Sequence, residues 1–121
     1  MTNLVTPKSE RDTVLLFTRN GLGHAPDPLP QVLVTKYLSL LLESGDFPAK
    51  ILFYTDGVRL ACSGSPVIDQ LHSLEEAGVE LVLCSTCLQF LGIADQVRVG
   101  IVGGMGDILT ALQQATKVLS L

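Results

Sequence analysis

Five short apolar runs recur along the chain, and most of them are continuous rather than alternating in hydrophobicity. They span residues 13–18, 50–54, 79–83, 97–102 and 117–121. Continuous apolar runs of this length are typical of strands that are covered on both faces of a sheet. The pattern therefore predicts five strands.

The segments between these runs predict helices. Apolar residues recur at helical spacing from Gln31 to about Ser44, and again from Ser65 to Gly78, where Ser65 and the proline after it mark a helix start. A short helix is expected after Cys84, through Phe90, and a last helix carries the apolar positions 108, 109, 112 and 115. Strands that alternate with helices predict an α/β fold, a parallel sheet with helices on both faces.

The loops after the first three strands are expected to share one edge of this sheet. Residues 19–30 are rich in glycine and proline, and residues 55–62 follow the second strand as a loop. The third strand hands over directly to its helix at Cys84. The carboxyl edge of an open parallel sheet is where such folds bind ligands.

Length and composition favour one small domain. The 121 residues are enough to bury a core, so we expect a single domain over residues 13–121 after a flexible polar leader of residues 1–12. The leader lacks the apolar segment of a secretory signal, and Lys36 interrupts the most apolar stretch. A cytoplasmic protein without a membrane span is expected.

The charge balance disfavours binding to nucleic acid. Eight Lys and Arg stand against 12 Asp and Glu, which gives a formal charge of −4, and no basic run is present. A chain of this sign would repel the phosphate backbone. No direct contact with nucleic acid is therefore expected.

The spacing Cys84-x-x-Cys87 marks the main candidate for chemistry. The first sulfur lies near the N-cap of the predicted short helix and the second inside its first turn, where backbone N–H groups and the helix dipole favour a thiolate. Cys84 and Cys87 are therefore the candidate catalytic residues. Two other interpretations stay open, because Cys84 can be a buried structural thiol and Cys87 can either resolve a disulfide or point into the core.

The remaining polar candidates are weaker. A closed zinc site would need Cys62, His24 or His72 as additional ligands, and none lies in a second paired motif, so no metal site is expected. Cys62 can approach Cys84 or be an incidental loop thiol. His24 can act as an acid or base if its loop folds over the thiolate, His72 is expected on a solvated helix face, and Arg59 either supports an anionic sulfur species or decorates a loop.

Glycines near the C-terminus do not predict a nucleotide site. Those at positions 100, 103, 104 and 106 do not match the dinucleotide-binding fingerprint and are better explained by tight turns and close helix packing. The first loop also lacks the hydroxyl-rich phosphate cradle of flavin-binding folds. No organic cofactor is expected.

Several motifs together resemble a known family. They are YTDGVRL at residues 54–60, LEEAGVEL at 74–81, CSTCL at 84–88 and VGIVGGM at 99–105. Over residues 13–121 the chain resembles the DsrE/DsrF-like family of small sulfurtransferase-like proteins, most closely the DsrE-like half of the YedF type linked to selenium metabolism. The resemblance implies a three-layer α/β/α fold, similar to flavodoxin, with a mostly parallel five-stranded sheet.

The resemblance also implies a function. Cys84 sits where sulfur-relay members of the family keep the cysteine that carries sulfur as a persulfide, so the implied function is a sulfur or selenium carrier. The implied partner is a separate TusA-like chain, and the implied assembly is a homo-oligomer, a trimer or hexamer. Two alternatives remain, a dithiol redox protein that uses Cys84 and Cys87 and a non-enzymatic assembly partner.

Overall fold

The computed structural model of the protein describes residues 12–121. The predicted leader, apart from Asp12, lies outside the described residues. In chain order the elements are β1 (Thr13–Phe17), α2 (Leu29–Ser44), β2 (Lys50–Phe53), the 3₁₀ helix η1 (Thr55–Ala61), α3 (Ile68–Glu76), β3 (Glu80–Cys84), α4 (Ser85–Leu91), the 3₁₀ helix η2 (Ala94–Gln96), β4 (Ile101–Gly103), α5 (Met105–Gln114) and β5 (Lys117–Ser120).

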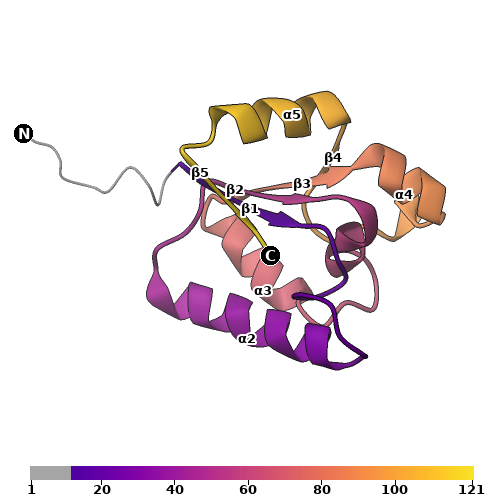
Figure 1. Cartoon of the computed structure of the whole chain (residues 1–121), viewed down its shortest axis with the longest axis horizontal. Helices are drawn as coiled ribbons and strands as arrows, with labels where there is room; N and C mark the ends of the chain where they lie inside the picture. Colours follow the sequence, from indigo (N-terminus) through magenta and orange to yellow (C-terminus); the bar gives the residue numbers. More distant parts are fainter. Residues whose placement is uncertain (1–11) are drawn as a thin grey trace, which may run out of the picture.

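The strands form one sheet in the order β4-β3-β2-β1-β5, and every pairing in it is parallel. Helices α2 and α3 lie on one side of the sheet and α5 on the other (Figure 1). The predicted three-layer α/β/α architecture is therefore confirmed. Because all strands are parallel, their carboxyl ends meet at one edge, which carries the start of η1 and the start of α4.

The core is centred on β1, β2 and β3. All of β1 is buried, and Phe17 at its carboxyl end is the register partner of Phe53 in β2. Their rings stack with centroids 5.7 Å apart and planes inclined by 18°. This contact holds the ends of two neighbouring strands side by side, directly beneath the loops of the carboxyl edge.

The fourth strand is shorter than predicted. It covers only Ile101–Gly103, and Gly100 before it has a φ of +87°. A side chain on Gly100 would come within 3.0 Å of the Leu81 side chain, so the chain bends tightly against β3 there. Val99 is buried, and Val97 pairs instead in an isolated antiparallel bridge with Cys62. The apolar segment 97–102 is therefore partly a buried loop and only partly a strand.

Two other segments also differ from the prediction. Residues 55–61 form the helix η1 rather than an irregular loop. Helix α3 begins at Ile68 rather than at Ser65, because the Ser65 hydroxyl accepts a hydrogen bond from the Val67 N–H and closes a turn before the helix. The glycines near the C-terminus turn the chain into α5, as predicted, with Gly104 as its N-cap.

Helix η1 packs very closely against the end of β1. The Tyr54 N–H donates to the Phe17 carbonyl at 3.1 Å. A side chain carbon added to Gly57 would lie 2.0 Å from that same carbonyl oxygen, closer than any real contact. Gly57 is therefore required by space, and it fixes how near η1 lies to the sheet.

We predict that Gly57→Ala lowers the free energy of unfolding by at least about 2 kcal/mol, because the methyl group forces η1 away from β1. The matched control is Gly106→Ala in the first turn of α5, where an added carbon meets no atom within 4 Å. That change should be neutral or stabilising by up to about 1 kcal/mol, through helix propensity. Urea unfolding of both variants measures the difference, and equal stabilities would contradict the proposed packing.

Candidate active site

The two cysteines lie where the sequence predicts them. Cys84 is the last residue of β3 and the N-cap of α4, and Cys87 lies in the first turn of that helix. The Cys84 sulfur accepts a hydrogen bond from the Cys87 backbone N–H at 3.5 Å. Both thiols are free. The spacing therefore builds a thiol pair at the carboxyl edge of the sheet.

Burial distinguishes the two thiols. Cys84 is only 1% exposed, whereas Cys87 is partly exposed. A reagent arriving from solvent meets Cys87 first. Sequence spacing alone does not reveal this order, because it depends on which elements cover the end of β3.

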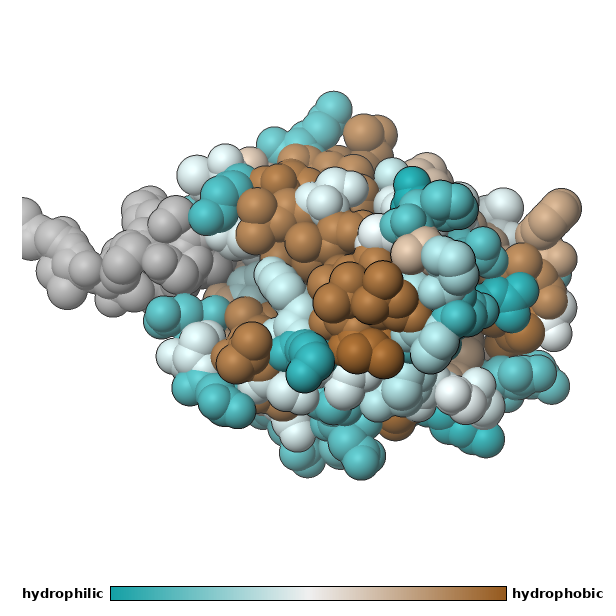
Figure 2. All heavy atoms as spheres, turned by 60° about the horizontal axis from the view of Figure 1, so that its bottom comes forward, coloured by the Kyte–Doolittle hydropathy of each residue, from teal (hydrophilic) through white to brown (hydrophobic). Residues whose placement is uncertain are grey.

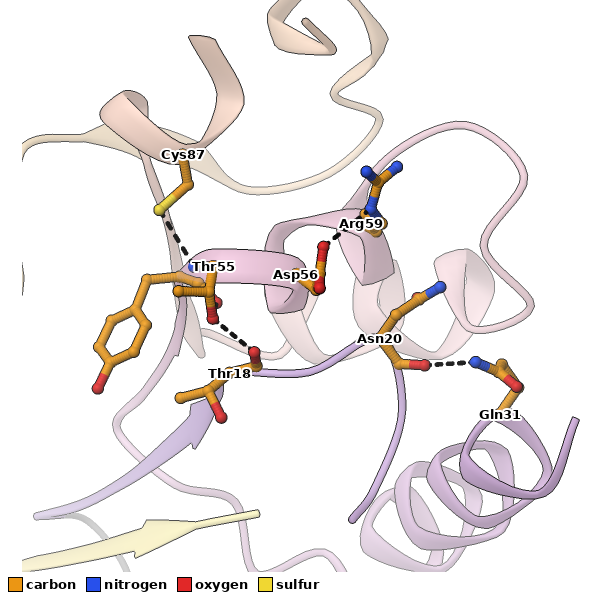
Figure 3. A network of polar contacts seen from close by, with 8 residues as sticks. Thr18, Asn20, Gln31, Thr55, Asp56, Arg59 and Cys87 are labelled. Carbon is orange, nitrogen blue, oxygen red and sulfur yellow. Dashed lines mark hydrogen bonds and ion pairs between the residues drawn. The ribbon is translucent and has the colours of Figure 1, made fainter. Parts of the chain in front are cut away.

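Thr55 is a site residue that the sequence analysis did not single out. Its backbone N–H donates to the Cys87 sulfur at 3.1 Å (Figure 3). Thr55 has a φ of +49°, a left-handed conformation that a β-branched residue rarely adopts and that costs about 1–3 kcal/mol. Its hydroxyl donates to the Thr18 carbonyl at 2.5 Å, which helps to hold this backbone in place. The available signal was the motif at residues 54–60, which carried the family resemblance without a role for Thr55.

The electrostatic environment of Cys87 favours the thiol. Burial raises the pKa of Cys87, and its hydrogen bond with Cys84 raises that pKa further, while the Thr55 N–H lowers it. The raised pKa opposes the expectation that the helix start makes this sulfur a thiolate. For Cys87 desolvation and the neighbouring thiol outweigh the backbone N–H groups.

Cys87 faces an apolar pocket of about 360 Å³. Its lining residues are Thr55, Asp56, Thr86, Cys87, Phe90 and Leu91. The Phe90 side chain is almost fully exposed, at 88%. The pocket therefore gives the accessible thiol an apolar surround that is open to a bound group.

Polar pockets lie on the other side of Asp56. One pocket of about 360 Å³ is lined by Asp56, Arg59 and His24, among others. The Arg59 Nε donates to the Asp56 carboxylate at 3.2 Å (Figure 3). A second pocket of about 300 Å³ shares Arg59 and reaches Cys62. His24 and Arg59 thus lie at the predicted edge of the sheet, but they line these polar pockets and not the pocket of Cys87.

Cys62 and His72 are separate from the thiol pair. Cys62 is buried at the end of η1, and burial raises its pKa while Arg59 lowers it. The predicted solvated position of His72 is confirmed, since its side chain is 58% exposed, with its ring nitrogens 3.9 Å from a Glu75 carboxylate oxygen and 3.5 Å from one of Glu76. Within residues 12–121, no three His, Cys, Asp or Glu side chains come together as metal ligands.

Most of the chain matches a known protein family. The model of the DsrE/DsrF-like family matches residues 33–121. The chain belongs to the DsrE/DsrF-like family. Membership in the DsrE/DsrF-like family indicates a role related to sulfur relay. The closer likeness to the YedF type stays a prediction.

Solved structures confirm the fold. A protein of unknown function, MTH1491 from Methanobacterium thermoautotrophicum, superposes with a TM-score of 0.66 at 18% identity, covering 90% of this chain and 97% of its own. The ychN protein from E. coli gives 0.65 at 18%, covering 90% and 98%, and BT1422 from Bacteroides thetaiotaomicron, of unknown function, gives 0.65 at 20%, covering 96% and 100%. No curated protein matches the sequence.

No helix in the described part of this DsrE/DsrF-like chain is both long and apolar enough to cross a lipid bilayer.

We predict that iodoacetamide modifies Cys87 before Cys84 in the native protein, because Cys87 lines the apolar pocket and is partly exposed whereas Cys84 is buried. The thiolate is the reacting form, so a raised pKa moves the rise of the Cys87 rate to a higher pH than for an ordinary thiol. Peptide mass spectrometry over a pH series measures both effects.

Cys84→Ala is the informative control for this profile. It removes the neighbouring thiol that raises the pKa of Cys87, so the Cys87 rate should rise at a lower pH than in the native chain. Faster modification of Cys84, or an unchanged profile in the variant, would show that the two side chains are not arranged as described.

Proposed function

We propose that this protein accepts a sulfane sulfur as a persulfide on Cys84 and passes it on in a sulfur relay. The observation that carries the proposal is the pair of free thiols at the end of β3, where the Cys87 backbone N–H donates to the Cys84 sulfur. Membership in the DsrE/DsrF-like family supports the same conclusion, because it indicates sulfur relay chemistry.

The acceptance step requires only a thiolate and an accessible donor. The Cys84 thiolate attacks the terminal sulfur of a donor persulfide, a new S–S bond forms on Cys84, and the S–S bond of the donor breaks to release the donor thiolate. No external oxidant or reductant is consumed. Because Cys84 is buried and Cys87 lines the pocket, the Cys87 side chain has to move aside for the donor sulfur to reach Cys84.

Burial gives Cys84 an advantage as the carrier. A persulfide at a position that is 1% exposed is shielded from small reductants in solution. The exposed ring of Phe90 at the rim of the same pocket offers an apolar contact to a docking protein. We propose a separate TusA-like chain as that exchange partner in the cytoplasm, with selenium as a second possible cargo on the basis of the resemblance to the YedF type.

A dithiol redox cycle is the second candidate, and the presence of two free thiols at the start of the same helix favours it. In that cycle one thiolate attacks a substrate disulfide, and the other then attacks the mixed disulfide and releases the reduced substrate. Cys84 and Cys87 end as an internal disulfide. Cys87 is essential in this cycle, whereas the sulfur carrier needs only Cys84.

We predict that reduced protein exposed to a persulfide donor gains one reductant-labile sulfur atom on Cys84, measured by intact and peptide mass spectrometry. Cys84→Ser should abolish this adduct. Cys87→Ser should keep it, because the smaller hydroxyl leaves the acceptor sulfur in place and opens the way to it. Cys62→Ser is the matched control, since Cys62 is a buried thiol that does not line the pocket of Cys87.

The alternative outcome is equally specific. A loss of two hydrogen atoms through a Cys84–Cys87 disulfide, without any sulfur adduct, would establish the redox cycle instead. Loss of sulfur uptake in Cys87→Ser while Cys84 still reacts with iodoacetamide would show that the roles of the two thiols are assigned wrongly.

Exposed apolar side chains support a proposed homo-oligomer, a trimer or hexamer. Figure 2, which brings the α2 side of the molecule forward, shows broad apolar areas between polar ones. Large hydrophobic side chains that are exposed include Leu29, Val32, Leu33 and Leu40 on α2 and Met105 and Leu109 on α5.

We predict a sedimentation mass that is a multiple of the 12.9 kDa chain, because burial of these apolar faces between copies stabilises an assembly. Dilution should shift the distribution towards smaller species if the association is reversible. A single species at the mass of one chain over the whole concentration range would rule out self-association through these faces.

A further inference from the structure

The polar pocket beside Asp56 carries charges of both signs, a feature that the thiol pair does not explain. Arg59 and Arg19 line it with positive charge, and Asp27 and Asp56 line it with negative charge. The adjoining pocket of about 300 Å³ also contains Asp27 and Arg59. A simple anion would be repelled by the carboxylates and a simple cation by the guanidinium groups. The lining suits a molecule that carries both charges.

Gln31 adds an unsatisfied acceptor to this place. Its Nε2 donates to the Asn20 carbonyl at 2.5 Å, which fixes the orientation of the amide, because the flipped amide would set two acceptors against each other (Figure 3). The Gln31 Oε1 is buried and has no hydrogen-bond partner among residues 12–121. A buried acceptor of this kind is costly to leave unpaired. Gln31 lines both polar pockets, and an N–H donor entering there would satisfy it.

Arg59 is free to bind a carboxylate. Within residues 12–121, its Nε alone forms an ion pair, with Asp56 at 3.2 Å. The guanidinium group has further N–H donors in a planar fork, which match the two oxygens of a carboxylate. Together with Asp27 and Gln31 as acceptors for an ammonium group, Arg59 makes a site complementary to an amino-acid zwitterion.

The polar pocket adjoins the reactive thiol. Asp56 lines both this pocket and the apolar pocket of Cys87. The preceding residue, Thr55, donates its N–H to the Cys87 sulfur. A zwitterion held beside Asp56 would therefore lie next to the residues that border the pocket of Cys87. A short side chain that ends in sulfur would make use of this position.

We propose that the polar pocket binds the amino-acid end of a cysteine persulfide, so that a small molecule supplies the sulfur and the TusA-like chain proposed above receives it. The sulfur transfer in this inference rests on the proposed function, whereas the binding of the amino-acid end in the polar pocket does not. The donor's ammonium group lies against Asp27 and Gln31 and its carboxylate against Arg59. The terminal sulfur passes to the protein thiolate, the donor S–S bond breaks, and free cysteine leaves.

The binding is tested with S-methylcysteine, a thioether that carries the zwitterion but cannot transfer sulfur. Calorimetric titration of the reduced native protein should show saturable binding. N-acetyl-S-methylcysteine, which lacks the ammonium group, and S-methylcysteine methyl ester, which lacks the carboxylate, should each bind at least about tenfold more weakly, as expected for a lost charged hydrogen bond.

Two pairs of matched variants locate the site. Arg59→Gln and Asp27→Asn should each weaken the binding of S-methylcysteine by about tenfold or more. Arg98→Gln and Asp95→Asn are the controls, because both positions are exposed and line neither polar pocket. The unfolding midpoint of each variant is compared with that of the native chain, to identify a variant that no longer folds. If one of the two pocket variants fails to fold, the binding measured with the other tests the pocket.

The outcomes separate this inference from the proposed function. Absence of saturable binding, equal binding of the N-acetyl compound, or equal losses in Arg59→Gln and Arg98→Gln would overturn the pocket assignment even if Cys84 forms a persulfide. In the transfer reaction, Arg59→Gln should lower kcat/KM for cysteine persulfide by about tenfold, whereas Arg98→Gln should leave it unchanged. An equal loss in both variants would also overturn the assignment.

Discussion

The end of β1 and the start of η1 approach each other so closely that Gly57 has no room for a side chain against the Phe17 carbonyl. The rest of the site depends on this contact. At the start of η1, Thr55 has a left-handed conformation and its N–H donates to the Cys87 sulfur. Asp56 and Arg59, on the same short helix, are placed between the thiol pocket and the polar pockets. One steric constraint thus positions two different chemical environments.

The stacked rings of Phe17 and Phe53 support this arrangement from below. They are register partners on adjacent strands, so they fix the relative height of the two strand ends that η1 bridges. The strain at Thr55 persists because its hydroxyl is bonded to the Thr18 carbonyl and its flanking residues are held by the sheet. Because the strand ends are rigid, Thr55 can keep its unfavourable backbone conformation and contact Cys87.

The sequence was most informative where local pattern and burial agree. The strands, their parallel arrangement and the position of Cys84 and Cys87 at a strand-to-helix junction were predictable, because apolar runs and helix signals report directly on buried elements. The start of β4 was not, because Val97 and Val99 are apolar for reasons of packing in a loop. The apolar residues of the segment 97–102 do not by themselves distinguish a buried loop from a strand.

The finer features of the site could not be read from the sequence. That Cys84 is covered and Cys87 is open depends on elements distant along the chain. The contact of Thr55 with Cys87 spans 32 positions, and the bond of Gln31 to Asn20 joins a helix to the preceding loop. Such pairings arise from tertiary packing, and a threonine or glutamine in isolation gives no signal of them.

The raised pKa of Cys87 has a consequence for the protein at rest. Peroxides and other stray oxidants react with thiolates and scarcely with thiols. A partly open sulfur that stays protonated is therefore a poor target for oxidative damage, although a bound donor or partner can still reach it. Burial thus slows the reactions of the Cys87 thiol and also protects the two thiols from oxidation until a donor or partner binds.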